Sequence, residues 1–203
     1  MAVVTVRPAG AGANTAFPSI TGGGGVHWVV VSDNTNTTYI RNNVAANRED
    51  DFTLGSSGLT TETITSIDVR AACRSEGTAN ASITLGLRLS GTNSLAAAHT
   101  AIPTSDTNYT DLAIARPGGG SWTVADLSTL QVAVIGNMLT STGLRVFEVY
   151  VDINYTAGGS TGQAKVWNGS SFVAKPVKVW NGSSFVTKPL KRWNGTSWVV
   201  TPY

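Results

Sequence analysis

The best candidate for metal chemistry in this sequence is the acidic run Glu49, Asp50 and Asp51. Adjacent carboxylates supply the hard oxygen ligands that Ca²⁺ prefers, and Asp33 from a neighbouring loop would add another. A solvated acidic turn explains the same residues equally well. We keep a calcium site at these residues as one expectation and expect no other cofactor.

Residue types suited to catalysis are few. The chain has two histidines, His27 and His99, and a single cysteine, Cys73. Neither histidine belongs to a cluster with zinc-ligand spacing. Cys73 follows an alternating apolar pattern, which indicates a small core residue. We therefore predict that the protein is not an enzyme.

The most regular spacing belongs to aromatic residues near the end of the sequence, in "KVWNGSSFVAKPV", "KVWNGSSFVTKPL" and "KRWNGTSWVVTPY", which repeat every 13 residues. Asn-Gly is a strong hairpin signal because both residues tolerate positive φ. The expected turns are Asn168-Gly169, Asn181-Gly182 and Asn194-Gly195. The ring pairs expected to face each other across the hairpins are Trp167 with Phe172, Trp180 with Phe185, and Trp193 with Trp198.

One such repeat is too short to bury its own ring pair, so another surface must cover the rings. The repeats stack on one another, or they pack on the same segment of other subunits as an oligomerisation stalk, for which we expect a trimer. Rings beside Asn, Ser and Lys also suit stacking against sugars, and repetition would add avidity. The sequence does not decide whether the rings form a core, a subunit interface or a ligand-binding surface.

Charge separates these repeats from the rest of the chain. Residues 1–155 contain eight Arg and twelve Asp and Glu, a net charge of −4, whereas residues 156–203 contain five Lys, one Arg and no acid, a net charge of +6. Such a shift usually marks a module boundary. Lysines keep short strand edges soluble, and we expect neither a nucleic-acid nor a membrane partner.

The elements that precede the repeats are expected to be strands. Apolar and polar residues alternate over 67–74, 83–89 and 147–155, which predicts strands with one buried face. In the last stretch, Phe147 and Val149 are expected to share the core face. About eight strands joined by Gly-, Ser-, Asn- and Asp-rich turns predict an all-β, jelly-roll-like β-sandwich.

We predict four parts: a flexible or extended N-terminal arm at 1–25, the sandwich at 26–155, a linker at 156–164, and a stack of three β-hairpin repeats at 165–203. The one helical signal is "SWTVADLSTL", where Ser121 or Thr123 would cap a single turn. The first residues lack the pattern of a secretory signal, so we expect assembly in a cytoplasm.

The repeats closely resemble the Trp-Asn-Gly repeats that end minor tail and other virion surface proteins of tailed phages infecting actinobacteria. The matching residues are Lys-Val-Trp-Asn-Gly-Ser-Ser-Phe-Val from 165 and from 178, and Lys-Arg-Trp-Asn-Gly-Thr-Ser-Trp-Val from 191. The sandwich is similar to a jelly-roll module of phage structural proteins. Its matching residues are Thr38-Tyr39-Ile40, Asp51-Phe52, Ile64 to Arg70, Ser121-Trp122-Thr123 to Leu130-Gln131, and Val146 to Tyr155.

The resemblance implies a non-enzymatic structural accessory protein of a virion, either a minor tail protein or a capsid decoration protein. It implies assembly in the host bacterial cytoplasm, a homotrimer, and contacts with other capsid or tail proteins. The alternative is a carbohydrate-binding module that recognises host cell-wall glycans through aromatic stacking.

Overall fold

The computed structural model describes residues 1–77, 81–138, 143–156, 164–188, 191–193 and 198–200. Contacts divide the chain into two units, Met1–Thr156 and Ala157–Tyr203, which we term the body and the repeat segment. In the part of the chain that is described, no helix has the length and apolar character needed to cross a membrane.

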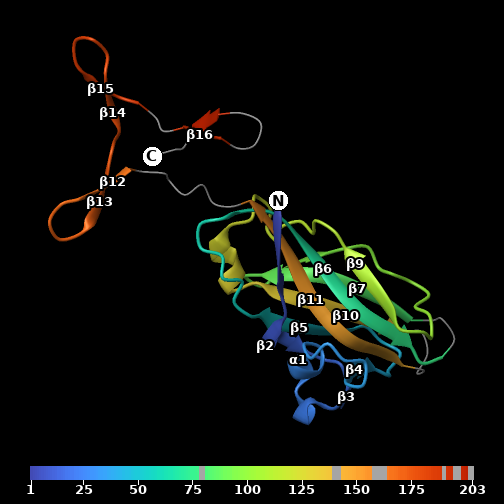
Figure 1. Cartoon of the computed structure of the whole chain (residues 1–203). Coiled ribbons are helices and arrows are strands. Elements are labelled where there is room, and N and C mark those ends of the chain that lie inside the picture. Colours follow the sequence, from blue (N-terminus) through green and yellow to red (C-terminus); the bar gives the residue numbers. More distant parts are fainter. Residues whose placement is uncertain (78–80, 139–142, 157–163, 189–190, 194–197, 201–203) are drawn as a thin grey trace. The chain divides into compact units, whose positions relative to one another are not determined.

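The body is a sandwich of two antiparallel sheets (Figure 1). The first sheet has the order β3-β4-β11-β6-β9, and β1 also pairs with β11. Its strands are β1 (Ala2–Val6), β3 (Ser19–Thr21), β4 (Tyr39–Asn42), β6 (Thr63–Ser75), β9 (Thr107–Asp111) and β11 (Leu144–Thr156). The predicted all-β sandwich is confirmed.

The second sheet has the order β2-β5-β10-β7-β8. Its strands are β2 (Pro8–Thr15), β5 (Arg48–Leu54), β7 (Ala81–Leu89), β8 (Thr92–Leu95) and β10 (Gln131–Met138). Among the residues of the body that are described, helical structure is limited to the short turns η1 (Gly23–Gly25), α1 (His27–Val30) and η2 (Val124–Ser128). Thr123 caps η2, because its hydroxyl accepts from the Asp126 amide and the Asp126 carboxylate accepts from the Thr123 amide.

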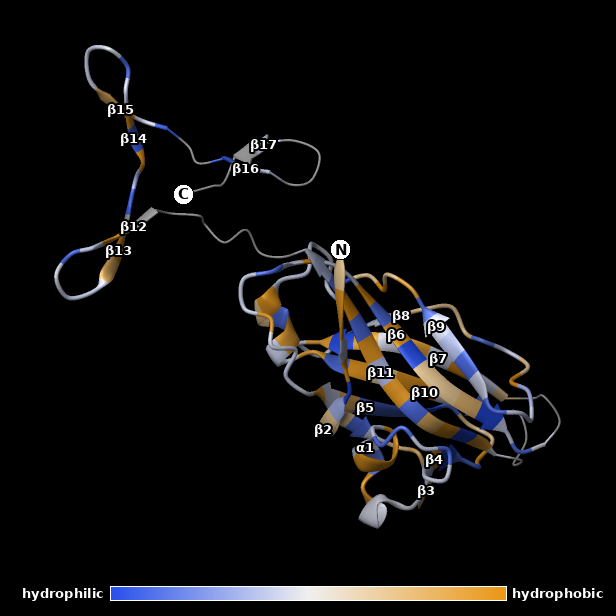
Figure 2. Cartoon of the chain, in the orientation of Figure 1, coloured by the Kyte–Doolittle hydropathy of each residue, from blue (hydrophilic) through white to orange (hydrophobic). Residues whose placement is uncertain are grey.

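The core lies between the two sheets and follows the alternation of the sequence. On β6, Ile67 and Cys73 are fully buried, and on β7, Ile83 and Leu87 are fully buried. Figure 2 shows the same alternation as bands of apolar and polar colour along the strands of the body. Burial of this apolar surface contributes roughly 25 cal/mol per Å² and dominates the stability of such a sandwich.

Phe147 is buried as predicted, with 1% of its surface exposed, but it does not belong to the main core cluster that contains Val149. Val146 packs in the core, whereas the Phe147 ring stacks edge-on against Tyr39 at 5.9 Å and lies 5.3 Å from the Arg74 guanidinium. The register of β11 on β6 shifts between Val146 and Glu148. Such a bulge adds one residue to a strand and reverses which side chains face inward.

Residues 1–25 were expected to form a flexible or extended arm, and the structure shows extended strands that belong to the two sheets of the body. β1 pairs with β11 in the first sheet, and β2 pairs with β5 in the second. The Asp50 carboxylate accepts hydrogen bonds from the Ala16 amide at 2.6 Å and the Phe17 amide at 2.9 Å. Glycine and alanine predicted flexibility here, but their small size allows β2 to lie close against β5: a Cβ on Gly12 would fall 2.6 Å from Asp51.

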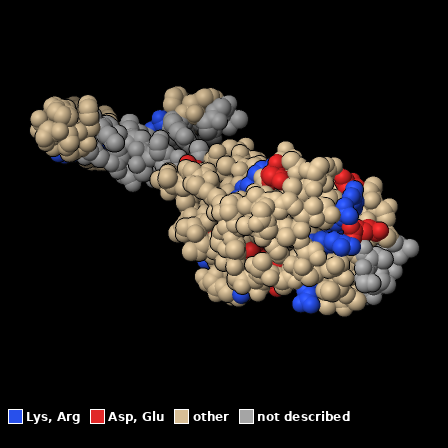
Figure 3. Space-filling view, turned by 90° about the horizontal axis from the view of Figure 1, so that it is seen from below, with Lys and Arg blue, Asp and Glu red and all other residues tan. Residues whose placement is uncertain are grey.

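Arginines on the outer surface of the body lie beside carboxylates, as the mixed blue and red atoms of Figure 3 show. Arg70 pairs with Asp152 at 2.7 Å and Arg74 with Asp106 at 3.1 Å. Pairs at such a surface contribute little stability, roughly 0–1 kcal/mol each. They do neutralise the positive charge of these arginines locally.

The repeat segment contains three two-stranded hairpins. Their strands are β12 (Ala164–Trp167) with β13 (Phe172–Lys175), β14 (Lys178–Trp180) with β15 (Phe185–Thr187), and β16 (Lys191–Trp193) with β17 (Trp198–Val200). An isolated two-stranded hairpin is at best marginally stable in water.

Candidate functional site

Each hairpin places its two aromatic residues directly opposite each other, at the end next to the loop. The ring centroids are 5.3 Å apart for Trp167 and Phe172, 5.3 Å for Trp180 and Phe185, and 5.8 Å for Trp193 and Trp198, each with planes 61° apart. An edge-to-face pair of this kind contributes about 0.5–1.5 kcal/mol beyond the area that it buries.

The loops between the rings use asparagine differently from the expected two-residue turn. Trp167 and Phe172 are separated by four residues, and the Asn168 carboxamide oxygen accepts from the amides of Ser170 at 3.0 Å and Ser171 at 2.9 Å. Only the glycine takes positive φ, at 102° for Gly169. The asparagine therefore holds the loop as a side-chain acceptor.

The second loop repeats this geometry. The Asn181 carboxamide oxygen accepts from the amides of Ser183 at 3.0 Å and Ser184 at 2.9 Å, and Gly182 has φ of 104°. Asn194 and Gly195 lie outside the described residues. The near-identical geometry of two loops indicates that the repeated residues specify a repeated local structure.

Each described ring pair is open to solvent. The exposed fraction is 54% for Trp167, 55% for Trp180 and 54% for Trp193, and it is higher for their partners Phe172, Phe185 and Trp198. Large aromatic side chains exposed to this extent commonly mark a surface that contacts something else. In Figure 2 the strands β13, β14 and β15 show apolar colour.

Each hairpin has two different faces because successive side chains of a strand point to opposite sides. In β14–β15, Lys178 and Thr187 form a pair on the same face as Trp180 and Phe185. The paired valines Val179 and Val186 lie on the other face. We term these the ring face and the valine face.

The valine face is apolar next to the loop and basic at the open end. Val166 and Val179 are 52% and 48% exposed. Lys188 continues the ladder of β15, since its amide donates to the Val177 carbonyl at 3.0 Å. Lys175 and Lys188 are exposed on this face, whereas the exposed Lys178 and Lys191 belong to the ring face.

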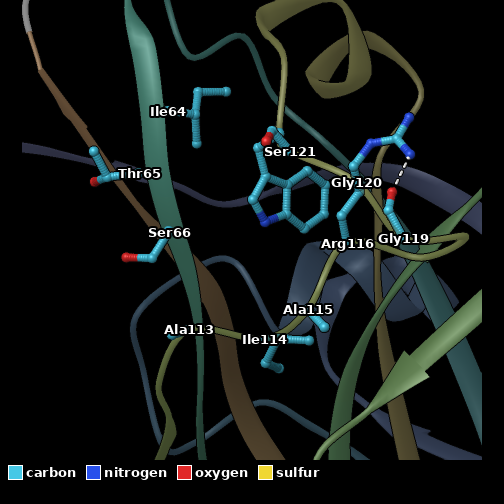
Figure 4. A pocket seen from close by; sticks show the side chains of 11 residues that line it. Ile64, Thr65, Ser66, Ala113, Ile114, Ala115, Arg116, Gly119, Gly120 and Ser121 are labelled. Carbon is cyan, nitrogen blue, oxygen red and sulfur yellow. Dashed lines mark hydrogen bonds between the residues drawn. The ribbon is translucent and has the colours of Figure 1, made fainter.

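A pocket of about 430 Å³ on the body was not predicted from the sequence. Its lining residues are Ile64, Thr65, Ser66, Ala113, Ile114, Ala115, Arg116, Gly119, Gly120, Ser121 and Trp122 (Figure 4). The start of β6 forms one wall, and the loop after β9 forms the opposite wall. No sequence signal marks these segments as neighbours, because the folded sheet brings them together.

The charged group of this pocket is already engaged. Arg116 donates from Nε and Nη2 to Asp126 at 3.0 and 2.8 Å, and from Nη1 to the Gly119 carbonyl at 2.8 Å (Figure 4). These hydrogen bonds lower the pKa of Asp126 to about 2. The guanidinium therefore braces the loop and is not turned to a ligand.

The residues of the expected calcium site have separate partners. Asp33 accepts from the Thr35 amide, Asp50 from the amides of Ala16 and Phe17, and Asp51 from the Asn14 carboxamide. Across the described residues, no three His, Cys, Asp or Glu side chains form a group that could hold a metal ion. The calcium expectation finds no support in this geometry.

One carboxylate of this set is electrostatically unusual. The Asp51 side chain is fully buried, and its Oδ1 has no hydrogen-bond partner in the described structure. Burial, together with the neighbouring Glu49 carboxylate, raises the pKa of Asp51 to about 6. Arg88 lies 3.8 Å from Asp51, too far for a hydrogen bond.

The two histidines are hydrogen-bonded to carboxylates, and the cysteine is buried in the core. His27 hydrogen-bonds through Nδ1 to the buried Asp50 carboxylate, and His99 through Nε2 to Asp111 at 3.0 Å. Cys73 is buried in the core, and burial raises the pKa of its thiol to about 12. A thiol in that state is not a nucleophile at neutral pH.

No protein family matches the sequence of this chain, and no curated protein matches it. Among solved structures, it is similar to "Family 16 Carbohydrate Binding Module-2", with 8% identity, 58% of this chain and 78% of that chain covered, and a TM-score of 0.37. It is also similar to "CBM35 from Cellvibrio japonicus Abf62", with 14% identity, coverage of 76% and 95%, and a TM-score of 0.42.

A third similar structure is the CBM22-1 and GH10 modules of the Clostridium thermocellum xylanase 10B complexed with xylohexaose. The identity is 8%, the TM-score is 0.39, and the match covers 75% of this chain and 26% of that longer chain. Similarity at this level carries no information about ligands. The all-β sandwich class is defined by the strand pairing of the body itself.

Proposed function

We propose that the protein is a non-enzymatic structural accessory protein on the surface of a tailed-phage virion, as a minor tail protein or a capsid decoration protein. The observation that carries this proposal is the repeat segment, in which hairpins of one design expose apolar side chains on both faces. Such hairpins need a partner surface to be stable. The resemblance of the repeats to those of virion surface proteins is the reason for proposing that the partner surface is part of a virion.

The oligomer is proposed to be a homotrimer joined through the valine faces of the first two hairpins, since Arg192 takes the place of one valine of the pair in the third. Paired valines such as Val179 and Val186 contain no polar side-chain atoms, so burial between subunits leaves no donor or acceptor unsatisfied. The lysines at the open end of each hairpin would lie at the edge of such a contact. There they remain solvated and oppose association of strand edges into larger aggregates.

The oligomer is tested by comparing the molar mass of the full chain with that of a variant that ends at Thr156. Multi-angle light scattering should give a trimer for the full chain and a monomer for the shortened one. Equal oligomeric states would remove the role of the repeat segment in assembly.

The location is tested by immunogold electron microscopy of phage particles, with antibody raised against residues 165–203. Gold over the heads identifies a decoration protein, and gold at the tail tip identifies a minor tail protein. Particles without gold would refute the virion assignment, provided that the antibody detects the denatured protein in the same preparation.

A further inference from the structure

We propose that the ring faces of the hairpins bind an acidic polysaccharide, with one short stretch of the polymer on each hairpin. This deepens the proposed function, on which it rests, by naming the partner of the repeat segment outside the virion. In β14–β15 the face that would bind consists of Trp180, Phe185, Lys178 and Thr187.

The rings have the exposure and geometry that contact with a sugar requires. Aromatic faces carry partial negative charge and attract the C–H bonds that a pyranose ring presents on its flat side. The planes of Trp180 and Phe185 are 61° apart, so the two rings form an angled platform. Both rings are more than half exposed, and the adjacent Ser183 and Ser184 provide polar groups at the loop.

A lysine on the same face gives the acidic preference. Lys178 is two residues before Trp180 on β14, which places the two Cα atoms about 7 Å apart on one side of the strand. The segment 156–203 has five Lys and one Arg and no acid, whereas residues 1–155 have a net charge of −4. An acidic polymer is therefore drawn to the repeat segment and not to the body.

The density of charge favours a glycan over a nucleic acid. Each strand of a DNA duplex carries a phosphate at roughly every 3.4 Å of helix axis, or about three along a three-residue strand such as β14. A hairpin such as β14–β15 has Lys178 and Lys188 along that length, on opposite faces. An acid on every second sugar matches this sparse spacing better.

Polarity assigns the ring face to the ligand and the valine face to the subunits. Buried indole N–H groups require an acceptor, which a sugar hydroxyl or carboxylate supplies and a valine contact does not. Three weak sites at a 13-residue period on one chain then act together. Linkage of this kind raises the overall affinity by about 10²–10⁴ without any new contact.

The test measures binding of the full chain to hyaluronan, which carries a carboxylate on every second sugar, and to its carboxyl-reduced form. Trp180→Ala should weaken hyaluronan binding about two- to tenfold, and the combined Trp167, Trp180 and Trp193→Ala variant should abolish it. Lys178→Gln, which keeps the rings, should weaken binding at low salt and reduce its salt dependence. Leu112→Ala, which removes an apolar side chain of the body that is 70% exposed, is the control and should bind normally.

Light scattering on the same variants separates this inference from the proposed oligomer. A triple variant that keeps its molar mass and loses hyaluronan supports the inference. Loss of mass in that variant would place the rings in the subunit interface and overturn it. Three further results would overturn the inference: equal binding to the two forms of the polymer, tighter binding to single-stranded oligo(dT), or unchanged binding by the triple variant. None of them bears on the virion assignment, which the gold labelling tests.

Discussion

Replacing Asp51 with Asn should stabilise the body at neutral and alkaline pH. The Asp51 carboxylate is buried beside Glu49, its Oδ1 lacks a hydrogen-bond partner among the described residues, and its pKa is raised from 3.8 to about 6. A raised folded-state pKa means that the protonated form is favoured in the folded protein. The stabilising effect of protonation is present below about pH 4 and is lost as the pH rises through 6.

The magnitude follows from the same two values. A difference from 3.8 to about 6 corresponds to about 3 kcal/mol, which is an upper limit for the penalty of ionised Asp51 above pH 7. An asparagine keeps the acceptor for Asn14, removes the charge and provides an amide donor beside Glu49. We expect Asp51→Asn to raise the free energy of unfolding at pH 8 by about 1–3 kcal/mol.

The assay is urea unfolding of wild type and variant across the pH range, with the body followed by its far-ultraviolet circular dichroism. The gain should be largest at pH 7–8 and should shrink towards pH 4, where wild-type Asp51 is protonated as well. A variant that is less stable than wild type at pH 8, or a gain that does not depend on pH, would refute the electrostatic reasoning.

Other substitutions in the body have their own expected outcomes. Asp126→Asn should show the opposite pH dependence: Arg116 lowers the pKa of Asp126 to about 2, so the loss of about 1–2 kcal/mol above pH 4 should fade as the pH falls towards 2, and equal losses at pH 2 and pH 7 in urea unfolding would contradict this. Cys73 should resist a thiol reagent in the native protein and react in urea, because it is buried with a pKa of about 12; fast native labelling would place it elsewhere. Deleting residues 1–6 should lower the urea midpoint by several tenths of a molar or more, because β1 pairs with β11 over five residues, and an unchanged midpoint would mean that β1 is dispensable.

Alternation in the sequence predicted those parts of the body whose strands run without interruption. Ile67 and Ile83 were placed correctly, because a side-chain period of two depends only on the local strand. The burial of Phe147 was predicted, but its separation from Val149 was not, because a bulge in β11 reverses the faces and no residue type in that stretch predicts the bulge. The N-terminal residues were predicted as a flexible or extended arm, and their pairing within the sheets was missed because it depends on β5 and β11, far along the chain.

The site was predictable to the extent that it is local. The 13-residue repeat and its Asn-Gly turns led to the ring pairs, which the hairpins bring within 5.3–5.8 Å. The role of Asn168 as a loop acceptor was not anticipated, because turn statistics alone do not distinguish positive φ from side-chain capping. The hydrogen-bonded pair of Arg116 and Asp126 depends on tertiary packing, and no periodic pattern in the sequence predicts it.

The pairing of β1 with β11 also constrains how the body is made. Ala2 lies opposite Tyr155, so the first strand of the body has no partner until the last one has left the ribosome. At a synthesis rate of roughly 5–20 residues per second, that interval is on the order of ten seconds. Sheet closure through contacts so distant in sequence is also intrinsically slow. During this interval β1, and until β10 is made also the edge of β5 that pairs with β10, are open to pairing with other chains. The newly made body is therefore most vulnerable to aggregation before its two ends meet.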